Sequence, residues 1–368
     1  MFSTEVSGDI TLTTGATTPY YLPFLDTRKR KILEITLDYV VIFSIFVTGI
    51  VTNSLVIIVY AKQGFKESVA VSMTTISVWD LLKCIAGILN SFSGILSLFD
   101  PVAAYSWLNI STIVFNYLIC FSSYVTSVMA AYVAVERCLC VSIPLKVKWL
   151  LTPRVTLTAC LVISVVVFGA FAVMFGIYDV IWEWSAMLNA TVAIAVKNEF
   201  YRRHDGPLFL YYNLSGILWP LAAFAVIVVA TVIIIFKLKQ GSKFRAGQGS
   251  MSSQHDQSSS QAKSEDQQKQ RQSLLKRDQQ VVKMLLVIII IYIACLAPRI
   301  AHYLAKYIVY DFYFLRRHHY LFEFVNYGIM LADSSNGAVN FFVFYRMSSS
   351  FRATFRATVC RRERSAET

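Results

Sequence analysis

Two pairs of oppositely charged residues stand within long apolar stretches of this chain. Glu136 and Arg137 are adjacent and close an apolar run that starts near Trp107. Asp80 and Lys83 lie three residues apart inside another apolar run, a spacing that puts both on one face of a helix. Charged side chains are costly inside a membrane unless they pair or carry a function. We therefore expect a cytoplasmic switch at Glu136 and Arg137. For Asp80 and Lys83 we expect either a functional centre or an ion pair that only stiffens the fold.

The composition indicates a membrane protein with several spans. Of the 368 residues, 56% are hydrophobic and only 15% are charged. The apolar residues form unbroken blocks of about 20 residues or more, the length that crosses the hydrocarbon core of a bilayer. The net charge of +12 does not indicate nucleic-acid binding, because lysine and arginine gather in alternate loops with a two-to-one excess. The positive-inside rule makes the richer side cytoplasmic and the N-terminus extracellular.

The apolar blocks predict an all-α fold, a seven-transmembrane helix bundle with a short amphipathic eighth helix. Pro220 and Pro298 lie inside two of the expected helices and should bend them. A long outer loop is expected at about 178–208. The seven helices are expected at roughly 34–60, 67–97, 106–140, 153–177, 208–238, 274–309 and 319–345.

The remaining segments flank this bundle of residues 34–346. Residues 1–33 are polar and form an extracellular tail without a visible signal peptide, so the first span should direct insertion. The third cytoplasmic loop, at about 240–272, is rich in Gln and Ser and is expected to be disordered. Residues 347–368 predict the amphipathic helix and a cytoplasmic tail, in which Cys360 is a candidate for palmitoylation.

Asn-X-Ser/Thr sequences, the acceptor pattern for glycosylation, occur at Asn109, Asn189 and Asn213, of which Asn213 lies close to a helix end where access is poor. Asn189 lies in the expected outer loop within an Asn-X-Thr sequence, which makes it the better candidate. Asn109 stands in an Asn-X-Ser sequence close to a helix end. No hydrolase, kinase or metal-binding pattern occurs, so we expect neither enzymatic activity nor a cofactor.

The sequence resembles the rhodopsin-type (class A) G-protein-coupled receptors over roughly residues 34–360, because residues typical of those receptors occur in the same order along its seven expected helices. Glu136, Arg137 and Cys138 match the triplet that ends the third helix of those receptors. Asn53 and Asp80 match polar residues of their first and second helices. The other matches are Pro220, Pro298, Asn336, Asn340 and the start of an eighth helix at Phe351-Arg352.

More narrowly, residues 62–68 and 136–148 resemble molluscan chemosensory and orphan neuropeptide-receptor-like sequences. The resemblance implies a multi-pass plasma-membrane receptor for an extracellular small molecule or peptide. Its partners would be a heterotrimeric G protein and arrestin, as the resemblance implies. Detection of a chemosensory cue is the first expectation, and a neuropeptide (FMRFamide-like) receptor is the alternative.

Some positions differ from the class A pattern. Leu296 replaces the usual tryptophan of the sixth helix, and residues 340–344 lack the proline and tyrosine of the seventh-helix motif. A decoy receptor that binds ligand without signalling therefore remains an alternative. A seven-span ligand-gated channel is a third, but it requires an intracellular N-terminus, which the charge distribution disfavours.

The resemblance also implies roles for the charged residues. Arg137 should pair with Glu136 and with Asp278 in the resting receptor, and release of the Asp278 pair should free Arg137 for the G protein. Many class A receptors bind sodium beside the acid of the second helix. Here we expect the Lys83 ammonium to replace that ion. The expected core polar network is Asn53, Asp80, Lys83, Thr126, Asp333, Asn336 and Asn340.

The outer half of the bundle should hold the ligand. Arg299 follows Pro298 directly and should face the cavity, where it would bind a carboxylate. Alternatively, it pairs with Glu323 or extends outward to water. The candidate pocket residues are Tyr117, Cys120, Tyr124, Arg299, His302, Tyr303, Glu323 and Tyr327.

Overall fold

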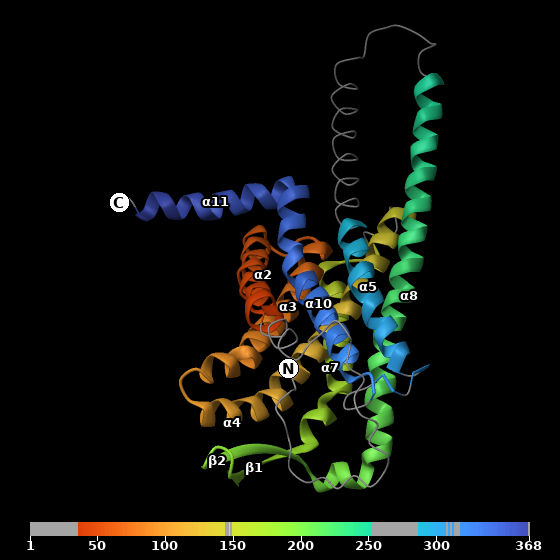
Figure 1. Cartoon of the computed structure of the whole chain (residues 1–368). Helices are drawn as coiled ribbons and strands as arrows, with labels where there is room; N and C mark the ends of the chain where they lie inside the picture. Colours follow the sequence, from red (N-terminus) through yellow and green to blue (C-terminus); the bar gives the residue numbers. More distant parts are fainter. Residues whose placement is uncertain are drawn as a thin grey trace.

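A computed structural model places the chain as a bundle of long helices (Figure 1). The structure describes residues 36–143, 147, 149–251, 286–306, 308–309, 311–312 and 317–366. The elements in chain order are η1 (Thr36–Ile42), α2 (Phe43–Gln63), α3 (Ser68–Leu96), α4 (Pro101–Ser111), η2 (Thr112–Asn116), α5 (Tyr117–Ser142), α7 (Pro153–Ala170), η3 (Ala172–Gly176), β1 (Tyr178–Ser185), β2 (Ala190–Lys197), α8 (Glu199–Met251), the Leu286–Lys306 helix, α10 (His319–Met347) and α11 (Ser349–Ala366).

The described helices form the expected seven-helix membrane bundle. Six helical segments among them are long and apolar enough to cross a membrane: Val40–Gln63, Ser68–Leu96, Pro101–Ser142, Pro153–Gly176, Glu199–Lys237 and Leu286–Lys306. The seventh helix is α10, which is more polar and packs against α2 and α3 (Figure 1). Helix α5 lies centrally, in contact with α3, α7 and α8.

Local sequence signals explain where two of these helices begin. Pro101 and Pro153 occupy the first turns of α4 and α7, where a proline loses no helical hydrogen bond. The preceding residues cap both helices. The Asp100 carboxylate accepts the backbone N–H groups of Val102 and Ala103 at 3.0 Å, and the Thr152 hydroxyl accepts that of Val155 at 3.3 Å.

The segment expected as the long outer loop contains a β-hairpin, which the all-α expectation did not include. Strands β1 and β2 pair antiparallel, from Tyr178 opposite Lys197 to Ser185 opposite Ala190. Both strands are rich in β-branched and aromatic residues, which favour extended backbone. The Ala193 N–H donates to the Ser106 hydroxyl at 3.1 Å, so the hairpin is fixed to α4.

Helix α8 is longer at both ends than the helix expected at 208–238. It begins at Glu199 and departs from helical backbone angles at His204, three residues before Pro207. Helical angles persist through Pro220, so a bend at that proline stays a prediction. The helix continues to Met251. Residues 240–251 of the expected third cytoplasmic loop are thus drawn as helix, the rest of that loop lies outside the described residues, and its disorder stays a prediction.

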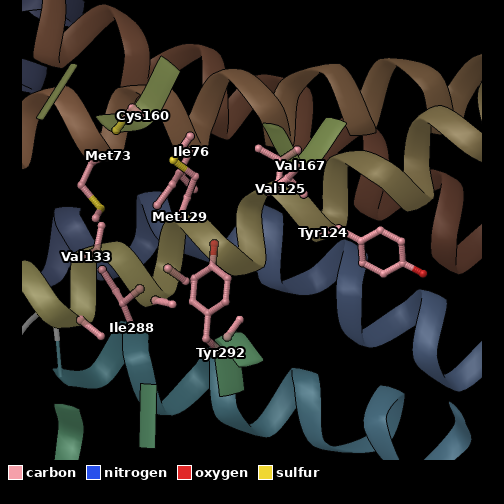
Figure 2. Close-up of a cluster of buried hydrophobic side chains, with 14 of the residues drawn as sticks. Met73, Ile76, Tyr124, Val125, Met129, Val133, Cys160, Val167, Ile288 and Tyr292 are labelled. Atoms are coloured by element: carbon pink, nitrogen blue, oxygen red, sulfur yellow. The ribbon is translucent and has the colours of Figure 1, made fainter. Parts of the chain in front are cut away.

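The hydrophobic core surrounds α5. Figure 2 shows Val125, Met129 and Val133 of α5 facing side chains from neighbouring helices, and Tyr292 projecting toward α5 from the Leu286–Lys306 helix. Tyr292 is 2% exposed. This contact joins the third and sixth helices through apolar packing, midway between the two ends of the bundle.

Helix α11 packs only its first turns against the bundle and then extends sideways from the end of α10 (Figure 1). Phe351 is buried, with its ring centroid 5.6 Å from those of Tyr60 and Phe344. Arg356 is exposed on another side of the helix, as an amphipathic helix requires. Cys360 lies within α11, and its palmitoylation stays a prediction.

Candidate functional site

The Glu136–Arg137 pair lies near the C-terminal end of α5. The Arg137 Nη2 atom donates to Glu136 Oε1 at 2.6 Å, and the side chains are 9% and 0% exposed. The Ser72 hydroxyl of α3 donates to the other carboxylate oxygen at 3.4 Å. Arg137 Nε has no hydrogen-bond partner among the described residues. The second expected partner, Asp278, lies outside the described residues.

A second buried ion pair lies in the middle of the bundle. Lys83 Nζ donates to Asp80 Oδ1 at 2.8 Å, and these side chains are 2% and 0% exposed. The same ammonium group is 3.3 Å from the backbone carbonyl of Asp333 in α10. Asn340 Nδ2 lies 3.5 Å from the second oxygen of Asp80. The Lys83 ammonium thus neutralises Asp80 directly and takes the place expected for it beside the acid of the second helix.

The other residues of the expected polar network differ in their contacts. Asn53 Nδ2 donates to the carbonyls of Gly49 and Gly337, both at 2.9 Å, and so joins α2 to α10. Thr126 is buried, but its hydroxyl donates to the Ser123 carbonyl of its own helix at 3.2 Å. Asn336 is buried, and its side-chain oxygen has no partner among the described residues.

Gly337 explains how α10 approaches the Asp80–Lys83 pair so closely. A Cβ atom at this position would lie 3.1 Å from both Asp80 Oδ1 and Lys83 Nζ, closer than side chains normally come. A glycine therefore lets the α10 backbone cross directly over the pair. This contact brings the Asp333 carbonyl within reach of Lys83.

A cavity of about 280 Å³ opens among α3, η2, α5, α8, the Leu286–Lys306 helix and α10. It lies at the opposite end of the bundle from Arg137. Five of the expected pocket residues line it: Cys120, Arg299, His302, Tyr303 and Tyr327. Tyr117 and Tyr124 do not line it, and the side chain of Glu323 lies outside the described residues.

Tyr117 and Tyr124 instead support the walls of the cavity. The Tyr124 ring is fully buried, and its hydroxyl is 2.5 Å from that of Tyr303. The Tyr117 ring stacks on Phe121 with a centroid distance of 5.4 Å, and its hydroxyl donates to that of Tyr178 at 3.4 Å. Both tyrosines hold neighbouring elements in place around the site.

Arg299 pairs with an acid that sequence reasoning did not assign to it. Its Nη2 atom forms an ion pair with the Asp333 carboxylate, and its guanidinium carbon lies 5.5 Å from the centroid of the Tyr124 ring. Since Asp333 also presents its carbonyl to Lys83, the two buried ion pairs meet at one residue of α10. A continuous polar path therefore runs from Arg299 at the cavity to Asp80 in the core.

Sequence reasoning missed several residues that line the cavity. Helical spacing offered a signal for two of them. Lys306 lies four residues after His302, and Asn116 lies four residues before Cys120, so each shares a helix face with an expected pocket residue. The others are Lys83, Asn90, Ser91, Thr112, Ile119, Tyr212, Phe322, Asn326, Ile329, Met330, Asp333 and Ser334.

Comparison with known families agrees with this arrangement. The family model of the serpentine type 7TM GPCR chemoreceptor Srw matches residues 38–362, nearly the whole chain. The chain belongs to this family. No curated protein matches it. The Srw assignment makes the chain a multi-pass membrane protein of a G-protein-coupled chemoreceptor type, in which the cavity and the Glu136–Arg137 pair stand at opposite ends. The finer resemblance to rhodopsin-type and molluscan sequences is not confirmed by it.

Proposed function

We propose that this Srw-family receptor lies in the plasma membrane with its N-terminus outside, detects an extracellular chemosensory cue and activates a heterotrimeric G protein. One observation carries the proposal. The ligand-sized cavity and the buried Glu136–Arg137 pair are joined by a single helix, α5. Cys120 lines the cavity, and Arg137 follows about 25 Å further along the same helix.

The size of the cavity favours a small molecule over a neuropeptide. A volume of about 280 Å³ is at the small end of ordinary ligand pockets. The hairpin β1–β2 and α4 occupy part of the outer surface as well. A receptor for FMRFamide-like peptides is therefore the less favoured member of the same receptor class. Binding of arrestin after activation is part of the same proposal.

The proposed coupling depends on Arg137, so its loss should silence the receptor. Arg137→Ala should lower ligand-stimulated G-protein activation about tenfold or more, since hydrogen bonds from a charged group contribute about 1.5–3 kcal/mol. Cells that co-express the receptor and a promiscuous G protein would be screened with small water-soluble compounds, at matched surface expression. Arg154→Ala changes an exposed arginine at the start of α7 and should leave the response intact. A ligand-gated current that persists in Arg137→Ala would instead support a channel.

The proposed orientation predicts a glycan on the hairpin turn. Asn189 is exposed and adopts a φ of 49°, which an asparagine tolerates in a tight turn. Receptor made in eukaryotic cells should carry a glycan whose removal by an endoglycosidase lowers the mass of the protein. The Asn189→Gln variant should lack both this glycan and the change in mass. Asn109→Gln is the matched control, because the Asn109 amide already donates to the Tyr105 carbonyl at 3.0 Å within α4. A wild-type protein without any glycan would contradict the orientation.

A further inference from the structure

Two residues that line the cavity carry buried hydrogen-bonding atoms that no described protein group satisfies. Arg299 and His302 are 7% and 4% exposed, and both line the cavity. Arg299 Nη1 and both ring nitrogens of His302 lack hydrogen-bond partners among the described residues. Unsatisfied buried polar atoms are rare in folded proteins, because each costs free energy comparable to a lost hydrogen bond. Their presence together beside a cavity indicates a bound group that completes them.

The arrangement of these atoms indicates the chemistry of that group. Arg299 and His302 are three residues apart on one helix, so their side chains leave the same face with about 4.5 Å of rise between them. The pair with Asp333 fixes the guanidinium through Nη2 and leaves the Nη1 edge for a ligand. A carboxylate has two oxygens that can each accept one of these N–H groups, and such charge-assisted bonds are the stronger kind.

The rest of the lining favours an anion with an apolar body. Among the described lining side chains, three are basic (Lys83, Arg299 and Lys306) and one is acidic (Asp333). Lys83 pairs with Asp80. The basic groups beside the unsatisfied atoms are therefore Arg299 and Lys306, and basic groups in an enclosed space attract anions. Apolar side chains from α5 and α10 form one part of the lining, and they are Ile119, Phe322, Ile329 and Met330.

We infer that the outer cavity binds a small organic carboxylate, with its carboxylate group between Arg299 and His302 and its apolar body against Phe322 and Met330. The inference rests on the proposed function only in taking this cavity as the ligand site. Because Arg299 also holds Asp333, a bound carboxylate would share or replace that ion pair. The charge of the ligand would then act on the residue that contacts Lys83.

The test compares acids with their uncharged amides on the purified receptor in detergent. Phenylacetate and hexanoate should raise the Tm in a concentration-dependent way, because a ligand that binds only the folded state stabilises it. Phenylacetamide and hexanamide have nearly the same shape without the charge and should shift the Tm little. An amide that stabilises the receptor as well as its acid would overturn the inference, as would no stabilisation by either acid.

Substitutions then locate the site. Arg299→Gln should lower the apparent affinity for the acids at least about tenfold, because a hydrogen bond from a charged group is lost. The affinity is read from the acid concentration needed to raise the Tm. Arg299→Gln with Asp333→Asn avoids a buried unpaired acid, so it keeps the test valid if the single variant fails to fold. Arg203→Gln is the control, because that arginine is 71% exposed on α8 and pairs with Glu199. Unchanged acid binding in the folded double variant would refute the assignment.

This binding test is separate from the signalling test. Thermal stabilisation by the acids needs no G protein, so the carboxylate site can fail while another ligand still activates signalling through Arg137. Conversely, acids that bind at Arg299 without any G-protein response would support the site and refute the proposed signalling.

Discussion

Lys83→Met should lower the free energy of unfolding by about 3–5 kcal/mol, the largest loss of stability expected from a single substitution in this receptor. The substitution keeps the length of the side chain but removes the ammonium group that lies 2.8 Å from Asp80 Oδ1. Asp80 has an exposed fraction of zero, so its carboxylate would remain buried without its nearest cation. Equilibrium unfolding of purified receptor in detergent measures the loss.

Two further variants separate the buried charge from other effects of the substitution. Asp80→Asn together with Lys83→Met removes both charges and should recover most of the lost stability, because no unpaired charge is then left buried. Arg203→Met breaks the exposed pair with Glu199, whose side chains are 71% and 65% exposed. Its effect should stay within about 1 kcal/mol, as for other surface ion pairs. Equal losses for Lys83→Met and Arg203→Met would contradict the argument.

The same variant tests whether Lys83 takes the place of a sodium ion. The wild-type receptor should show the same Tm in sodium and potassium salts, since the Lys83 ammonium already neutralises Asp80. In Lys83→Met the Asp80 carboxylate and the Asn340 amide remain, and sodium should then raise the Tm relative to potassium. A sodium-dependent Tm in the wild-type receptor would show that the ammonium does not exclude the ion.

Short-range patterns predicted the fold well, because the bilayer imposes them. A span needs about 20 apolar residues, so the apolar blocks located the helices closely. Thr152 and Pro153 located the start of α7, since capping and the fixed φ of proline act within one turn. The Asp80–Lys83 contact was predictable for the same reason, because residues three apart on a helix are neighbours.

Contacts between residues far apart in the sequence were harder to predict. The pair between Arg299 and Asp333 depends on the rotation of α10 against the Leu286–Lys306 helix, and apolar periodicity does not fix that rotation in a bundle whose outer faces also meet lipid. The hairpin was missed because the segment between the fourth and fifth helices was expected to be a long loop. Its β-branched and aromatic residues were not recognised as two strands that pair with each other. Gly337 shows its role only once α10 is placed over the buried pair.

Glu136→Gln should raise agonist-free G-protein activation about tenfold. The Glu136 carboxylate accepts from Arg137 Nη2 at 2.6 Å while both side chains are buried, and we take this pair as the inactive arrangement. A neutral amide accepts a weaker hydrogen bond, and a difference of about 1.4 kcal/mol shifts a two-state equilibrium tenfold. If the release of Arg137 is the step that allows the G protein to bind, the active population rises by that factor. Basal nucleotide exchange in membranes with matched receptor amounts measures it.

The size and origin of this increase distinguish a switch from a purely structural pair. Ser72→Ala removes only the weaker 3.4 Å contact to the other carboxylate oxygen, so its effect on basal exchange should be much smaller. Glu136→Gln combined with Arg137→Ala should be silent, because the released arginine is the group that acts on the G protein. If Glu136→Gln folds normally and its basal exchange equals that of the wild type, the pair only stabilises the end of α5. Coupling would then have to act through the polar path from Arg299 to Asp80 without Arg137 as its final step.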